Sequence, residues 1–144
     1  MTGVRLTVRI DFGSGGALGP GKIRLLETVR KTGSISQAGR SLGMSYRRAW
    51  LLIDDLNRCF RTPVVVTRPG GAKGGGAELT RFGCKLIEQY RAIESHAASS
   101  AKRRMRDLEA ALRARAKPSQ RRLKSPIKST KTGAWAVAGS GPRR

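Results

Sequence analysis

Two adjacent arginines, Arg47 and Arg48, follow Ser45 and Tyr46 at the start of a segment with helical spacing. A guanidinium group can donate two parallel hydrogen bonds to O6 and N7 of guanine, and a recognition helix reads base edges with residues near its N-terminus. An arginine at such a place can instead contact a phosphate, which positions a protein without reading sequence. These four side chains are therefore candidates for contacts with double-stranded DNA, and Ser45 has a second possible role as the cap of the helix.

A shorter helix is expected immediately before this segment. Ser34, followed three residues later by Gln37, has the pattern of a capping box, and Gly43 is placed to end the helix. The free amides and the positive end of such a helix suit a phosphate group. Ser34, Ser36 and Gln37 are therefore expected at the DNA backbone, in the arrangement of a helix-turn-helix.

Two short β-branched or apolar runs, residues 64–67 and 77–80, are separated by a glycine-rich loop. This pattern predicts a hairpin, and a hairpin directly after a helix-turn-helix is a wing. The loop is not a nucleotide-binding loop, because Lys73 is followed by glycine rather than by serine or threonine. Instead, Arg68, Lys73 and Arg81 are candidates for contacts with a phosphate or the minor groove.

Trp50 could stack on a base, but it falls on one helical stripe with Ala49 and Ile53. We therefore expect Trp50 to pack in the core. Alternation of apolar and polar residues over 4–10 predicts a strand with one buried face. Pro20 and Gly33 are placed to begin and end a further helix.

The last predicted helix is capped by Thr80 and keeps an apolar period to about Ala116, where Pro118 stops it. This apolar stripe is longer than one small domain needs to cover itself, so a second copy of the chain is an expected partner; a monomer is the alternative. The expected organisation is a DNA-binding domain over residues 1–97, a helical extension over 98–116 and a disordered basic tail over 117–144. The fold class is mainly α with a small β-wing.

Residues suited to catalysis are few. His96 is the only histidine, and no serine or cysteine motif accompanies it. Asp54 and Asp55 diverge on a helix and do not form a carboxylate pair. Cys59 and Cys84 lack metal-ligand spacing and are expected as buried or half-buried thiols. The sequence predicts neither an enzyme nor a metal site.

The formal net charge is +21, from 30 Lys and Arg against 9 Asp and Glu among 144 residues. Residues 1–100 contribute +9 and residues 101–144 contribute +12. Such a chain attracts any polyanion, so charge alone does not distinguish DNA from RNA or a membrane surface. No apolar window approaches the length of a membrane span, and no signal peptide is recognised, so we expect a cytoplasmic protein associated with the nucleoid.

Three motifs in this order resemble the N-terminal DNA-binding domain of the molybdate-responsive regulator ModE and, more distantly, the LysR-type winged helix. The motifs are Gly33-Ser34-Ile35-Ser36-Gln37-Ala38, Ser45-Tyr46 with Ala49-Trp50, and the glycine-rich stretch that runs from Gly70 through Leu79-Thr80-Arg81 to Gly83. The resemblance covers roughly residues 4–96. It implies a homodimer that places two recognition helices on a pseudo-palindromic site.

The resemblance does not extend to the oxyanion-binding region of the full-length regulator. Residues 101–144 are a basic, low-complexity stretch that could not form it. We therefore expect no cofactor and no sensing of molybdate by this chain. The function expected from the sequence is transcriptional regulation, and the alternative is a low-specificity protein of the nucleoid type that coats DNA.

Overall fold

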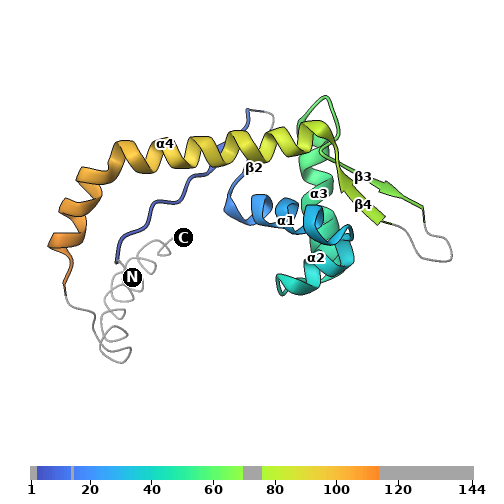
Figure 1. Cartoon of the computed structure of the whole chain (residues 1–144), viewed down its shortest axis with the longest axis horizontal. Coiled ribbons are helices and arrows are strands. Elements are labelled where there is room, and N and C mark those ends of the chain that lie inside the picture. Colours follow the sequence, from blue (N-terminus) through green and yellow to red (C-terminus); the bar gives the residue numbers. More distant parts are fainter. Residues whose placement is uncertain (1–2, 14, 70–75, 114–144) are drawn as a thin grey trace, which may run out of the picture.

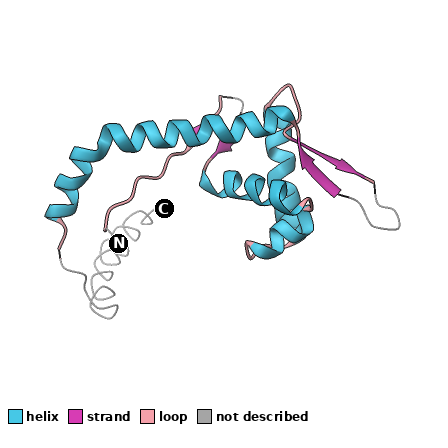
Figure 2. Ribbon diagram, viewed as in Figure 1, coloured by secondary structure: helices cyan, strands magenta, loops and turns pink. Residues whose placement is uncertain are grey.

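The computed structural model describes residues 3–13, 15–69 and 76–113. Figures 1 and 2 show a mainly helical chain with two small antiparallel hairpins. The elements in chain order are β1 (Ile10–Asp11), β2 (Ala17–Leu18), α1 (Pro20–Thr32), α2 (Ile35–Ser41), α3 (Tyr46–Cys59), β3 (Val65–Arg68), β4 (Gly76–Leu79) and α4 (Arg81–Ala111). The expected winged helix-turn-helix is confirmed, with α2 and α3 as the helix pair and β3 and β4 as the wing. The expected basic tail and Lys73 lie outside the described residues.

The helix boundaries follow local signals in the sequence. Gly33 ends α1 with a φ of 72°, a conformation that side chains disfavour. Each of the next three helices begins at a hydroxyl that accepts a backbone N–H: Ser34 from Gln37, Ser45 from Arg48, and Thr80 from Gly83. Because these caps satisfy amides that have no partner within the helix, they fix where the helices start.

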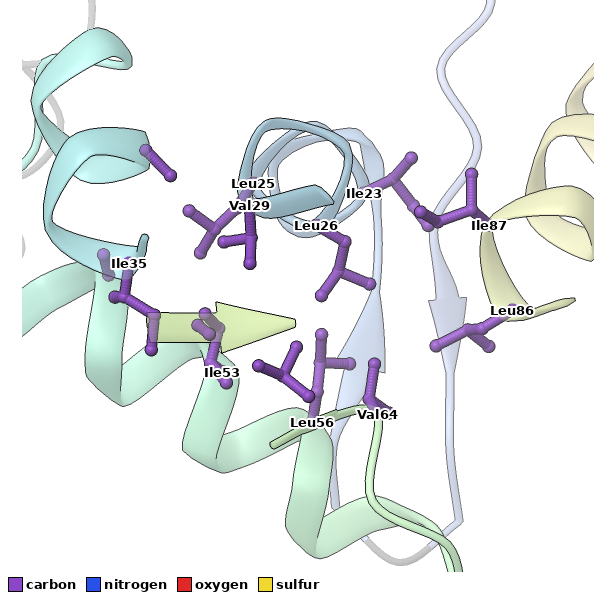
Figure 3. Packing of buried hydrophobic residues seen from close by; sticks show 14 of the residues in the cluster. Ile23, Leu25, Leu26, Val29, Ile35, Ile53, Leu56, Val64, Leu86 and Ile87 are labelled. Carbon is purple, nitrogen blue, oxygen red and sulfur yellow. The ribbon is translucent and has the colours of Figure 1, made fainter. Parts of the chain in front are cut away.

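The core forms around α1, whose Ile23, Leu25, Leu26 and Val29 have no exposed surface. Figure 3 shows these side chains meeting those of α2, α3, α4 and the base of the wing. Apolar burial on this scale is the dominant stabilising term in a domain of this size. The remaining buried apolar residues are Leu18, Ile35, Ala38, Ala49, Ile53, Leu56, Val64, Val65, Ala77, Leu86, Ile87 and Tyr90.

The strand predicted over residues 4–10 is wrong except at its end, because only Ile10 joins a ladder, paired with Leu18 in the β1–β2 hairpin. The preceding residues run beside α4 (Figure 1). The Tyr90 hydroxyl donates to the Val8 carbonyl at 2.7 Å, and the Gly3 N–H donates to Glu109 at 3.3 Å. Alternation therefore marked an extended segment that packs on a helix rather than on a neighbouring strand.

Helix α4 leaves the core and continues to Ala111, a few residues before the expected end near Ala116. Arg91, in the first half of α4, contacts α1: its guanidinium donates two hydrogen bonds to Glu27, at 3.0 and 2.8 Å. A third hydrogen bond, at 2.7 Å, goes to Glu94. This ion pair joins α4 to α1 beside the buried contacts of Leu86, Ile87 and Tyr90.

Gly83 tests how tightly the wing base packs on α4. A methyl group at Gly83 would lie 2.3 Å from the Val64 carbonyl oxygen. We expect Gly83→Ala to lower the free energy of unfolding by about 1–3 kcal/mol, because backbone must move to admit the methyl group. Urea denaturation measures this change.

Gly21→Ala is the matched control, since Gly21 lies in α1 with no heavy atom within 4 Å of the added carbon. This change should raise the free energy of unfolding by about 0.4–1 kcal/mol. If Gly83→Ala stabilised the protein as Gly21→Ala does, the close approach of α4 to the wing would be contradicted.

Glu27 makes stability depend on pH. Hydrogen bonds from Arg91 hold the pKa of Glu27 below its ordinary value of 4.5, although burial opposes this shift. A carboxylate with a lowered pKa stabilises the fold above its unfolded pKa, and that contribution disappears as pH falls through the folded pKa. We therefore expect Glu27→Gln to be less stable than the wild type at pH 7, with the difference shrinking below about pH 4.5.

The measurement is thermal unfolding of both proteins from pH 7 to pH 3. Glu88→Gln, at an exposed glutamate of α4, is the control and should follow the wild type throughout. A gap between wild type and Glu27→Gln that stayed constant over the whole range would contradict the role given to this ion pair.

Candidate nucleic-acid interface

An open groove of about 330 Å³ lies where the first turns of α2 and α3 meet the wing. It brings together residues that are far apart in the sequence and that the sequence analysis had singled out separately. Ser34 and Ser36 come from the start of α2, Tyr46 from α3, and Arg68 from the end of β3. The other residues that line the groove are Ile35, Trp50, Thr67, Gly76 and Ala77.

The wing is held at this groove by backbone contacts. The Ala77 N–H donates to the Gly33 carbonyl at 2.9 Å, so β4 lies against the turn between α1 and α2. At the other end of the hairpin, Thr80 donates its N–H to Val64 at 3.0 Å and its hydroxyl to Pro63 at 2.7 Å. These contacts set the distance between the wing and the cap of α2.

Asn57 connects the same hairpin to α3, and sequence reasoning did not single it out. Its side-chain oxygen accepts the N–H groups of Val64 and Val65 at 2.7 and 3.2 Å, and its amide nitrogen donates to the Val65 carbonyl at 3.1 Å. The wing therefore keeps a fixed place relative to α3. The only signal in the sequence was an amide placed seven residues before a β-branched run.

The prediction that Trp50 packs in the core is wrong. Its side chain is 42% exposed and lines the groove one turn beyond Tyr46, which is 56% exposed. The core side of α3 is formed by Ala49, Ile53 and Leu56, and Trp50 stands at the margin of that stripe. Helical spacing correctly placed Trp50 next to the buried residues of α3. It could not show that the wing stops short of Trp50 and leaves this side chain exposed in the groove.

Arg47 and Arg48 share one small hollow at the start of α3, but only Arg48 also lines a larger one. Both are exposed. Arg48 lines a second open hollow of about 710 Å³ on the opposite edge of α3, together with Arg9, Lys22 and Arg58. A smaller hollow holds Arg47 and Arg48 beside Leu51 and Leu52. Basic side chains, with Asp55 among them, therefore line α3 on the side away from the wing.

Several of the candidate residues already have partners. Ser34 and Ser45 accept capping N–H groups, and Ser36 accepts a hydrogen bond from Arg40 at 3.4 Å. Arg68 forms an exposed ion pair with Glu78 across the wing. An exposed pair of this kind stabilises little, so Arg68 can exchange it for a phosphate at small cost.

Three further candidates, Arg81, Gln37 and Lys73, are not seen at the groove. Arg81 is the first residue of α4 and lines a separate hollow with Phe82 and Lys85, at the end of β4 away from the α2 cap. Gln37 is exposed on α2 and gives its backbone N–H to Ser34. Lys73 lies outside the described residues.

No set of three His, Cys, Asp or Glu side chains among the described residues is placed to hold a metal ion. His96 is exposed on α4, and Cys59 and Cys84 are free and half-buried, as expected. Within the described part of the chain, no helix is both long and apolar enough to span a membrane.

Comparison with known proteins identifies relatives of this region. The chain is 41% identical over 96 residues to the molybdenum transport protein ModE of Azotobacter vinelandii. It is 42% identical over 71 residues to the DNA-binding transcriptional dual regulator ModE of Escherichia coli, and 45% identical over 82 residues to the molybdenum-pterin-binding protein MopB of Rhodobacter capsulatus. The N-terminal part of this chain is homologous to ModE. No family model matches the chain.

The homology to ModE is partial in both directions. The three alignments cover 65%, 49% and 57% of this chain, but only 36%, 27% and 30% of the respective relatives. The chain therefore spans about a third of the length of the curated relatives it matches. The names of two of these relatives mention molybdenum, and that property belongs to those proteins.

Asn57 provides a test of how the wing is positioned. We expect Asn57→Ala to lower the free energy of unfolding by about 1–3 kcal/mol, because it leaves the partly buried N–H groups of the wing base without an acceptor. Hydrogen exchange at Val65 should accelerate in this variant. Asp54→Ala on the same helix removes an ion pair with Arg58, whose side chain is 76% exposed, and should change stability by less than about 0.5 kcal/mol. Unchanged exchange at Val65 in Asn57→Ala would contradict the role of Asn57.

Proposed function

We propose that this chain is a DNA-binding transcriptional regulator of the ModE winged-helix type, with double-stranded DNA as its ligand. The observation that carries the proposal is the groove, because it places the cap of α2, the first turn of α3 and the wing on one surface. In this arrangement α3 enters the major groove, and Arg47 and Arg48 are the candidates for base contacts. The α2 cap and Arg68 contact phosphates on either side. ModE relatives that are named transcriptional regulators support this assignment.

The proposed assembly is a homodimer on a pseudo-palindromic site. Large apolar side chains remain exposed along α4 beyond the core, namely Ile93 and Leu108, and Leu112 follows directly after the helix. Pairing of two copies through this helix covers these side chains. It also places two recognition helices about 34 Å apart, one turn of DNA. The proposed location is the cytoplasm, at the nucleoid, and no catalytic activity is proposed.

A second candidate function is low-specificity coating of DNA. It is favoured by a basic cluster at the far end of α4, where Lys102, Arg103, Arg104 and Arg106 are all exposed. Such side chains contact phosphates without regard to sequence, and their contribution falls steeply with salt. The groove argues for the regulator, because a coating protein has no need of a recognition helix and a wing in fixed register.

Selection of bound sequences from a random duplex library distinguishes the two functions. At near-physiological salt the full chain should enrich a palindromic motif and prefer it over random DNA by about 10³-fold or more. Strong, salt-sensitive binding with no enriched motif would reject the regulator and leave the coating protein.

Arg47→Ala should then reduce the preference for the selected site by about 1–3 kcal/mol, if Arg47 contacts a guanine. Arg61→Ala is the matched control, because Arg61 is exposed beyond the end of α3 and lines a different hollow, with Phe60 and Phe82. An equal loss of preference in both variants would show that general charge, and not base contact, explains the effect of Arg47.

A further inference from the structure

The outward side of α3 carries more apolar surface than an arginine-based readout requires. Tyr46, Trp50 and Leu51 are 56%, 42% and 43% exposed, and all three lie within the first two turns of the helix. They are three of the eight large apolar side chains that remain exposed in the described part of the chain. Exposed apolar side chains gathered on one element indicate a contact surface.

The placement of these side chains follows from the core. Ala49, Ile53 and Leu56 bury one side of α3, which leaves the opposite side to solvent. Tyr46 and Trp50 are four residues apart and form one row on the edge that faces the wing. Leu51 stands one turn beyond Arg47 and shares a hollow with it on the outward side. The apolar side chains therefore interleave with the arginines instead of forming a separate patch.

The charge around this apolar surface identifies the partner. Arg47, Arg48 and Arg68 lie beside this surface; its acidic neighbours are Asp55, which lines the hollow of Leu51, and Glu78, which is paired with Arg68. In the major groove of DNA, the apolar group at the base edges is the C5 methyl of thymine, and apolar side chains recognise it by contact. Arginines interleaved with apolar side chains are complementary to a groove whose walls are phosphates and whose floor carries thymine methyl groups.

We propose that Tyr46, Trp50 and Leu51 determine sequence specificity by contacting thymine methyl groups in the major groove. This inference rests on the proposed function and adds a second readout to the guanine contacts of the arginines. It also gives the exposed Trp50 a role that core packing would not. The selected site should accordingly contain thymines in each half-site that arginine contacts alone do not explain.

Replacing thymine by deoxyuridine tests the proposal, because uracil keeps the same pairing edge and the O4 acceptor but lacks the methyl group. The selected duplex is prepared with each thymine of a half-site replaced in turn, and the affinity of the full chain is measured for every duplex. For at least one position, affinity should fall about fourfold, the value expected for one buried methyl group. In Tyr46→Ala, Trp50→Ala or Leu51→Ala, the thymine-to-uracil ratio at that position should fall to about one.

The ratio is measured within each protein, so a variant that binds all DNA less tightly remains informative. Leu6→Ala is the matched control, since it truncates an exposed apolar residue of the N-terminal segment, outside both the groove and the proposed dimer contact, and should keep the wild-type ratio. A selected site whose uracil duplexes all bind as well as the parent would overturn this inference and leave the regulator intact. Sensitivity to uracil that persisted in all three variants would also overturn it, since the effect would then come from DNA shape. Failure to select any site would instead reject the proposed function.

Discussion

The burial of α1 is the constraint on which the rest of the structure depends. One 13-residue helix has four side chains without exposed surface, and α2, α3, α4 and the wing all pack on it. Protein interiors are close-packed, so a change in the volume of one of these four side chains would be felt by several elements at once. Packing on α1 therefore contributes to the relative position of α3 and the wing, although no residue of α1 lines the groove between them.

Polar and close backbone contacts add to the apolar core in fixing how the helices and the wing are placed relative to one another. Asn57 fastens the wing to α3, Gly83 lets α4 approach the Val64 carbonyl, and Arg91 joins α4 to α1. Each of these contacts links two different elements, and each lies outside the groove. The outcome is a rigid frame around a surface whose own side chains are largely exposed, an arrangement suited to binding a large and preformed partner.

The parts of this fold that could be predicted from sequence are those decided locally. At Ser34 and Ser45 a hydroxyl accepts the N–H of the residue three positions later, and this contact fixes where the helix starts. The helix-turn-helix can therefore be predicted from the local sequence alone. The strand expected over residues 4–10 failed because alternation does not reveal which element will pair with the segment. Trp50 and Asn57 were misplaced or missed because their environment depends on where the wing docks, which periodicity does not encode.

The route of the N-terminal segment has a consequence for the geometry of the whole molecule. Gly3 donates to Glu109, and a side chain at Gly3 would come within 3.1 Å of Leu112, so the two ends of the described chain meet at one pole of α4. Figure 1 shows that pole at the opposite side of the molecule from α3 and the wing. A fluorophore or an affinity handle attached near either residue would therefore stand clear of the groove. Labels on both residues would report the docking of the N-terminal segment on α4 without touching the surface that contains Trp50.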